Sequence, residues 1–301
     1  MKPLAFGLCL STAALAQVDF SISPGQSGFK LLKLQPSARA SGLSGAGSAL
    51  PGLGSDQDQN PAVVRPEWVE LSVGMASLPE QFASSIQHTA WRVPAGPGTV
   101  TGRVRYEGFQ DLAGYDEEDR STGLFSASTW SAGAGYSWVI DSAWTLGARA
   151  AYARNTVERF SNWAIAGDVG LRFAPKAPWS LGASLLNVGY AAKPDWSDSA
   201  KETLPTTIVL GGAWRFPVLH GWHLTAMADL RHPNDEEWTA PIGLEASWSI
   251  LTLRTGFPLL LEDARPSLGA GLAWENLRLD ASVAWHAATG MTSGLELALG
   301  L

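Results

Sequence analysis

Few residues of this chain have the types and spacing that catalysis or metal binding requires. His220 and His223 are spaced like a pair of metal ligands, but an odd separation puts them on opposite faces of a strand, so we expect no metal site. The acidic run 116–119 could bind a divalent cation or bridge lipopolysaccharide, although a solvated loop is the simpler interpretation. No motif joins a nucleophile, a base and an orienting acid. The sequence therefore predicts neither an enzyme nor a protein with a cofactor.

The other ionisable residues share a position on the hydrophilic face of an alternating segment. Asp168 and Arg172, for example, lie four residues apart and therefore on one face of a strand. Charges enclosed together are tolerated when they neutralise one another, so we expect a network of ion pairs in the interior. Its predicted members are Arg149, Asp168, Arg172, Arg215, Asp229, Glu245, Arg254 and Asp280.

The elements that must position these charges are strands, because apolar and hydrophilic residues alternate from about Trp68 to Leu301. Most segments are about ten to twelve residues long, close to the roughly 9–11 tilted residues that cross a bilayer. Their apolar faces repeatedly carry a Trp near one end, as at Trp144 and Trp222, which suits the aromatic girdles of membrane barrels. With 14 Trp and only 16% charged residues, the composition disfavours a soluble β-sandwich, which would also alternate. We therefore predict an all-β fold, a single transmembrane antiparallel β-barrel with lipid outside and the charges in its lumen.

About fourteen strands are expected, and twelve remain possible because the break near Ser249 is weak. Short and longer connections alternate along the chain, and bacterial barrels keep short turns in the periplasm and longer loops outside. The longer connections are predicted at 110–123, 189–204, 232–238 and 258–265. This alternation predicts a bacterial outer-membrane location with both termini periplasmic. The predicted strands are 68–77, 84–94, 99–109, 124–140, 143–155, 160–174, 179–188, 205–216, 221–231, 239–250, 251–257, 266–275, 276–287 and 290–301.

The N-terminus has the features of an exported protein. A positive start at Lys2, the mostly apolar residues 4–15 and a small residue at Ala16 predict a signal peptide of residues 1–16. Of the 21 Lys and Arg, Lys2 is lost with this peptide, which leaves 20 against 28 Asp and Glu, a net charge of −8. Such an acidic chain is a poor candidate for nucleic-acid binding, and we expect no nucleic-acid partner.

The only cysteine, Cys9, lies within the predicted signal peptide. Lipid attachment to Cys9 is the alternative, but Leu8 stands where that chemistry expects a small residue. The mature chain is therefore expected to have no thiol, no disulfide and no thiolate metal site.

Residues 17–66 contain no long alternating strand and include runs of Gly, Ala and Ser. Such a segment could pack inside the lumen, since small residues permit close approach of the backbone; a flexible periplasmic linker is the alternative. Ser37–Ala49 followed by Asn60-Pro61-Ala62 resembles the N-terminal signature of the PorV/PorQ family, which is related to FadL-type fourteen-stranded barrels. This resemblance implies a hatch, residues 17–66, inside a barrel of residues 67–301. The hatch motif comprises Arg39, Gly42, Gly45, Asn60, Pro61 and Ala62.

Further fragments follow the same family order, among them 121–126, 164–173 and 184–189. The resemblance is closer to PorQ than to PorV. It implies a non-enzymatic scaffold or cargo-attachment component of the type IX protein secretion system, with other proteins of that system as partners. Outer-membrane lipid and lipopolysaccharide are the other expected partners. The alternative is a FadL-like transporter of hydrophobic small molecules, and a general diffusion pore is a third possibility.

Overall fold

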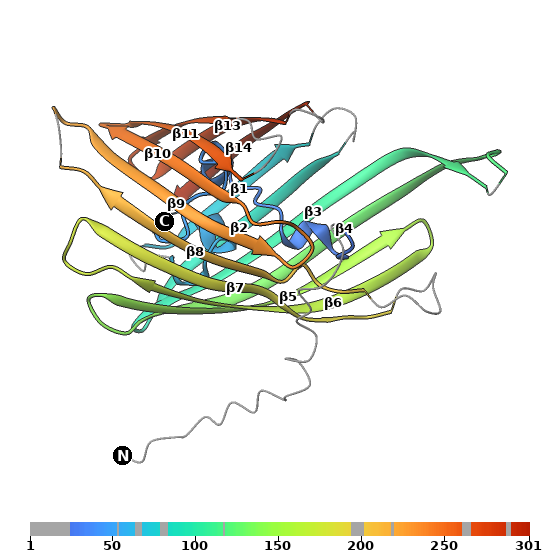
Figure 1. The fold of residues 1–301 in the computed structure, drawn as a ribbon, viewed down its shortest axis with the longest axis horizontal. Helices are drawn as coiled ribbons and strands as arrows, with labels where there is room; N and C mark the ends of the chain where they lie inside the picture. The colour runs from blue at the N-terminus through green and yellow to red at the C-terminus, as the bar shows by residue number, and fades with distance from the viewer. Residues whose placement is uncertain are drawn as a thin grey trace, which may run out of the picture.

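The computed structural model describes residues 25–52, 54–63, 68–78, 84–116, 118–193, 202–217, 220–260, 266–286 and 290–301. In this part of the chain, antiparallel strands form one closed barrel, in which β1 completes the ring by pairing with β14 (Figure 1). The predicted antiparallel barrel is thus confirmed. The signal peptide 1–16 and residues 17–24, 53 and 64–66 of the predicted hatch lie outside the described residues. The strands are β1 (Glu70–Ser77), β2 (Ser85–Ala95), β3 (Gly98–Tyr115), β4 (Ser121–Val139), β5 (Trp144–Val157), β6 (Phe160–Phe173), β7 (Trp179–Ala191), β8 (Thr207–Arg215), β9 (His223–Pro233), β10 (Ala240–Trp248), β11 (Leu251–Leu259), β12 (Ser267–Trp274), β13 (Leu277–His286) and β14 (Gly290–Gly300).

Strands β10 and β11 are two separate strands. Ser249 adopts a positive φ of 53°, and the antiparallel register between the strands begins with Trp248 opposite Leu251. The chain therefore reverses at this point, and the barrel has fourteen strands in the described residues. The alternative of twelve strands is wrong.

The period-two pattern divides the wall into an outer and an inner face. Along β1, Val73 is 45% exposed, whereas its neighbour Ser72 is fully buried. The same contrast recurs in β14, where Leu297 is exposed and Glu296 is buried. Ring closure pairs the strand edges that would otherwise be unsatisfied in hydrocarbon, and the apolar outer face suits lipid.

The two ends of the barrel differ in their connections. At one end, which we call the short-turn end, a few residues join the strands, as at Gly96-Pro97 between β2 and β3. The opposite end of the barrel, which we call the long-loop end, has the longest connections, such as residues 192–206 between β7 and β8. Gly300 lies at the short-turn end, where its N–H bonds to the Asn276 carbonyl at 2.7 Å.

One predicted loop, 110–123, is wrong. Strand β3 continues to Tyr115 and β4 begins at Ser121, so the two strands extend beyond the wall as a paired ribbon, which projects from the barrel in Figure 1. β2 pairs with β3 only as far as Gly108, and β5 pairs with β4 only from Ala127. A ribbon that is solvated on both faces gains nothing from an apolar face, so its sequence lacks the alternation of the wall.

Residues 25–63 form short helices inside the ring of strands (Figure 1). They are η2 (Lys30–Leu32), α1 (Ala38–Gly42), η3 (Gly54–Asp58) and η4 (Pro61–Val63). Among the described residues, no helix has the length and apolar character needed to cross a membrane. We call residues 25–63 the N-terminal segment.

Candidate functional site

The N-terminal segment packs closely against the inner face of the wall, and helix α1 contacts β11, β12, β13 and β14. A Cβ on Gly42 would lie 3.0 Å from the Cα of Gly269 in β12, and a Cβ on Gly256 in β11 would lie 2.3 Å from the carbonyl carbon of Leu43. Glycines therefore allow the two backbones to approach. Gly45 of the predicted hatch motif has a φ of 87° and its N–H bonds to the Ala40 carbonyl at 2.8 Å, which ends the helix in the conformation that favours glycine.

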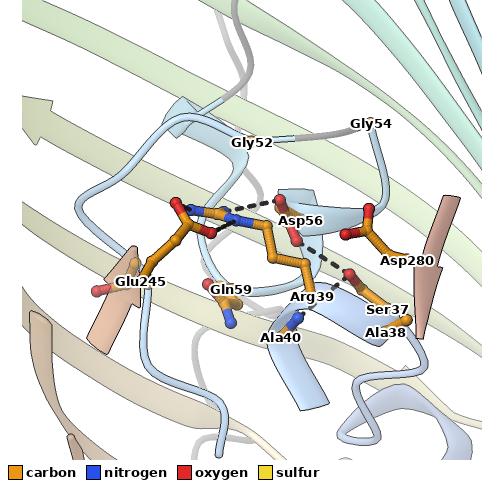
Figure 2. Close-up of polar contacts among 12 residues, drawn as sticks. Ser37, Ala38, Arg39, Ala40, Gly52, Gly54, Asp56, Gln59, Glu245 and Asp280 are labelled. Atoms are coloured by element: carbon orange, nitrogen blue, oxygen red, sulfur yellow. Dashed lines mark hydrogen bonds and ion pairs between the residues drawn. The ribbon is translucent and has the colours of Figure 1, made fainter. Parts of the chain in front are cut away.

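A row of alternating charges joins the segment to the wall, and Figure 2 shows its part from Asp56 through Arg39 to Glu245. Arg39 donates from Nη1 to Asp56 Oδ2 at 3.0 Å and from Nε to Glu245 Oε2 at 2.9 Å. Glu245 also accepts from Arg254 Nε at 2.8 Å, and Arg254 Nη1 donates to Asp280 Oδ1 at 2.6 Å. Each charge faces opposite charges, which offsets the cost of its burial. In order, this charge row consists of Asp56, Arg39, Glu245, Arg254, Asp280 and Arg278.

A second group of charges surrounds Asp58 of η3. Arg149 in β5 donates from Nη1 to Asp58 Oδ1 at 2.9 Å, and its Nε donates to Asp168 Oδ2 at 2.5 Å. Arg103 forms an ion pair with Asp58, and Arg105 Nη1 lies 3.5 Å from Asp58 Oδ2. The Asp58 side chain is 8% exposed, so it brings negative charge to three wall cations in a site that water barely reaches.

Asp229 and Asn60 bind the backbone of the segment to the wall. Asp229 Oδ2 in β9 accepts the N–H groups of Gly47 and Ser48 at 3.1 and 3.0 Å. Asn60 Nδ2 donates to the carbonyls of Ser48 and Leu171 at 2.9 and 3.1 Å. These bonds satisfy buried polar groups that would otherwise be costly.

Pro61 and Ala62 of the predicted hatch motif lie in η4 against β5 and β6. A Cβ on Gly147 would lie 2.3 Å from the Pro61 carbonyl carbon and 2.4 Å from the Ala62 nitrogen. The Asn60 Oδ1 accepts the Ala62 N–H at 2.9 Å, which fixes the turn into η4. The motif therefore contacts the inner wall, but whether it acts as a hatch stays a prediction.

Two predicted network members lie toward the short-turn end. Arg172 Nε donates to the Ala49 carbonyl at 3.0 Å, while Asp168, expected beside it, is bound by Arg149. Arg172 and Arg215 both line a cavity of about 400 Å³ at the short-turn end, together with Asp141 and Ala62.

At the long-loop end, the start of the described chain is tied to the β9–β10 connection. Lys33 Nζ lies 3.0 Å from Asp235 Oδ2, the Ser27 hydroxyl hydrogen-bonds to the same oxygen, and Gly25 N–H bonds to the Asp235 carbonyl at 2.9 Å. Partial burial would raise the pKa of Asp235, but the Ser27 hydroxyl and the Lys33 ammonium together hold it below its usual value. We call Ser27, Lys33 and Asp235 the latch. Because Gly25 and Gly300 lie at opposite ends, the periplasmic location of both termini stays a prediction.

A second cavity, of about 430 Å³, opens at the long-loop end above the N-terminal segment. More than half of its lining is apolar, and its charged members include Lys33 and Glu236, which contact each other. Its apolar lining residues are Leu34, Pro36, Ala40, Ala76, Leu78, Ile86, Pro233, Pro241, Pro258, Ala284 and Trp285. We call it the vestibule.

The described residues contain no group of three or more His, Cys, Asp and Glu placed to hold a metal ion. His220 lies in the turn before β9 with a φ of 50°, and His223 begins that strand. In the acidic run, Asp116 and Glu118 pair with Arg120 in the exposed ribbon.

The predicted network omits several residues of the charged interior, notably Arg103, Arg105 and Glu296. The alternation in β3 was the signal that could have found two of them, since Thr101, Arg103 and Arg105 occupy every second position and all are buried. Which wall residue faces which residue of the N-terminal segment had no comparable signal.

No protein-family model matches the chain, and no curated protein sequence matches it. Solved structures do show a similar fold. The toluene transporter TbuX of Ralstonia pickettii is 16% identical with a TM-score of 0.60, over 90% of this chain and 98% of TbuX. The toluene transporter TodX of Pseudomonas putida is 11% identical with a TM-score of 0.64, over 87% of this chain and 97% of TodX.

A FadL homologue of Pseudomonas aeruginosa is 11% identical with a TM-score of 0.51, over 87% of this chain and 97% of the homologue. Identities this low establish only that the fold is similar, that of a closed antiparallel barrel with fourteen strands in the described residues of this chain. The barrel and these similar structures point to the outer membrane. They give no specific support to the PorV/PorQ resemblance.

Proposed function

We propose that this chain is an outer-membrane channel for small hydrophobic molecules, which enter through the vestibule. The observation that carries the proposal is an apolar-lined cavity at the mouth of a barrel whose fold is shared with two toluene transporters. A cavity of about 150 Å³ is sufficient for benzene, so the 430 Å³ of the vestibule accommodates a monoaromatic or short-chain molecule.

The charges of the vestibule favour an uncharged ligand. Lys33 is bound to Asp235 and Glu236, so its ammonium is compensated before any ligand arrives. Ligand sites of this kind gain affinity from apolar walls and take orientation from a few polar groups. A neutral hydrocarbon would lose little hydration free energy on entry, whereas an ion would lose a large hydration free energy between mostly apolar walls.

The N-terminal segment forms part of the vestibule, through Leu34, Gln35, Ser44 and other residues. The segment also contributes Asp56 and Arg39 to the charge row and Asp58 to the second group of ion pairs, and these contacts tie it to the wall below. Passage through the barrel therefore requires this segment to rearrange.

The test is uptake of radiolabelled toluene into vesicles that contain the purified barrel. Ala284 lines the vestibule on the inner face of β13, so Ala284→Trp should fill the site and reduce uptake about tenfold. Ala281 lies on the lipid-facing side of the same strand, and Ala281→Trp is the matched control that should leave uptake unchanged. Wild-type uptake no faster than that of empty vesicles would refute the proposal.

A scaffold role in type IX secretion is the second candidate. It is favoured by the ribbon beyond the wall, where Tyr115 is 64% and Leu124 is 68% exposed and the outer edge of each strand is unpaired by any residue that the structure describes. Exposed strand edges are sites at which an extended segment of another protein can pair. Crosslinking through a photoreactive residue at position 124 in native outer membranes should then capture type IX secretion proteins. Toluene uptake together with no such crosslink would leave the channel as the function.

A further inference from the structure

The outer face of the wall changes character abruptly near the long-loop end of β4 to β7. Four aromatic rings form a continuous row across these strands, with neighbouring ring centroids 5.3, 6.3 and 5.9 Å apart. They are the rings of Trp130, Tyr152, Trp163 and Tyr190. Trp130 and Trp163 are more than a third exposed. A row of Trp and Tyr on the outside of a barrel is typical of the interface between hydrocarbon and headgroups.

A hydrophilic row lies directly beyond these rings. Ser128, Thr156 and Ser161 are paired with one another across β4, β5 and β6. Arg154, between Tyr152 and Thr156 on the same face of β5, is exposed and donates to the Ser161 hydroxyl at 3.1 Å. Arg154 is in register with Trp130 and Trp163, so one guanidinium at the level of the aromatic row lies beside three hydroxyls just above it.

Arg154 is the one Arg, Lys, Asp or Glu on the outer side of the barrel wall in the residues that the structure describes. In the barrel wall that the structure describes, the other Arg, Lys, Asp and Glu of the strands share the inner parity, as Arg149 does on β5. A cation facing hydrocarbon near the bilayer centre would cost several kcal/mol, so an outward Arg is tolerated only at headgroup depth. Its uniqueness at this depth calls for a specific reason.

The height of Arg154 supports headgroup depth. From Trp144 to Tyr152 the outer face of β5 spans eight residues, which is about 20 Å along the axis of a barrel whose strands tilt by about 40°. Arg154 lies roughly 5 Å higher, at the upper edge of an apolar band of about 25 Å. Arg159, in the exposed turn after β5, adds a second cation at this end, with its guanidinium 5.1 Å from the Phe160 ring centre.

We infer that Arg154, Arg159 and the surrounding hydroxyls bind the phosphorylated headgroup of an outer-leaflet glycolipid, the lipid A part of lipopolysaccharide. The long-loop end faces the outer leaflet if loops lie outside as in other bacterial barrels, and lipid A presents phosphates at this depth. Arg is suited to phosphate because its planar donors bind two oxygens at once. The aromatic row below would contact the first part of the acyl chains. This inference does not depend on what passes through the lumen.

The experiment compares the wild type with Arg154→Gln/Arg159→Gln and with Lys176→Gln, which removes one charge from an exposed turn at the short-turn end. After mild detergent extraction, lipid A bound per barrel is measured by mass spectrometry. We expect the double variant to retain about tenfold less lipid A, as loss of a charge-assisted contact implies, and Lys176→Gln to match the wild type.

A second measurement uses delipidated barrel and its thermal unfolding. Bisphosphorylated lipid A should raise the Tm of the wild type, and chemically dephosphorylated lipid A should not; the double variant should respond to neither. Equal lipid A retention in all three proteins would overturn the assignment. So would an equal, Arg154-dependent stabilisation by phosphatidylglycerol, because the site would then not select the glycolipid. Both readouts remain valid if toluene uptake fails.

Discussion

Replacing Glu245 with Gln should loosen the N-terminal segment while leaving the barrel folded. Glu245 accepts two hydrogen bonds from Arg39, at 2.9 and 3.3 Å, and one from Arg254 at 2.8 Å. Arg254 keeps its ion pair with Asp280. Arg39 loses its ion pair with the wall and keeps the one with Asp56, which belongs to the segment itself. Breaking a buried ion pair costs about 3 kcal/mol, which corresponds to a roughly hundredfold increase in the detached population.

Detachment can be measured as the reaction rate of a single cysteine, because the only natural one, Cys9, lies in the predicted signal peptide. Ser55 in η3 is 4% exposed and its hydroxyl has no hydrogen-bond partner among the described residues, so Ser55→Cys is a mild probe. Labelling with a water-soluble maleimide should be about a hundredfold faster in Glu245→Gln than in the parent.

Glu237→Gln removes an exposed carboxylate from the β9–β10 connection and serves as the matched control. A second control is the double-mutant cycle with Arg39→Gln, in which the combined effect should be smaller than the sum of the two single effects. If the labelling rate changes by less than about twofold in Glu245→Gln, the ion pair does not hold the segment and the reasoning is wrong. Unchanged heat-modifiability shows that the barrel stays folded.

Three further predictions concern the segment and its latch. Gly256→Ala should destabilise the docked segment by about 1–3 kcal/mol, because the new Cβ would overlap the backbone of Leu43. The control Gly212→Ala should be neutral, because a Cβ there meets no atom closer than 3.6 Å. The labelling rate of Ser55→Cys measures both effects. Asp229→Asn should destabilise the docked segment by about 1–2 kcal/mol, because it weakens two charge-assisted hydrogen bonds from the N–H groups of Gly47 and Ser48. An unchanged labelling rate of Ser55→Cys would show that these bonds do not hold the segment. Because the pKa of Asp235 is lowered in the folded protein, the latch contributes stability above the unfolded value of about 3.9 and loses it as the pH falls through the folded pKa. The hydrogen-exchange protection factor of the Gly25 N–H, which bonds to the Asp235 carbonyl and is referenced to the intrinsic exchange rate at each pH, should therefore be lower at acid pH than at pH 7, and Asp235→Asn should abolish that difference.

The wall of the barrel could be predicted from the sequence because every strand must place apolar residues toward lipid and hydrophilic residues toward the lumen, which produces the same alternation in each strand. Leu297 and Glu296 satisfy this demand as neighbours, so period two alone assigns their faces. The ribbon beyond Gly108 has water on both faces, which removes the demand, and its Gly and Asp residues were therefore interpreted as a loop.

The pairing of residues in the lumen could not be predicted in the same way. Arg39 and Glu245 are 206 positions apart and belong to elements with no shared period. Arg149 and Asp168 were both predicted to face inward, but that they bind each other depends on the register between β5 and β6. Register over adjacent strands is set by turns and closure together, and one alternating sequence is compatible with more than one register.

The partition of charge between segment and wall has an electrical consequence. Around Asp58, three guanidinium groups of the wall face one wall carboxylate, that of Asp168, and the second carboxylate comes from the segment. A barrel without residues 25–63 would keep the three guanidinium groups and lose the Asp58 carboxylate, so its open lumen would have a positive potential near these groups. In a planar bilayer such a conduit would pass chloride in preference to potassium, although the chain as a whole is an acidic protein.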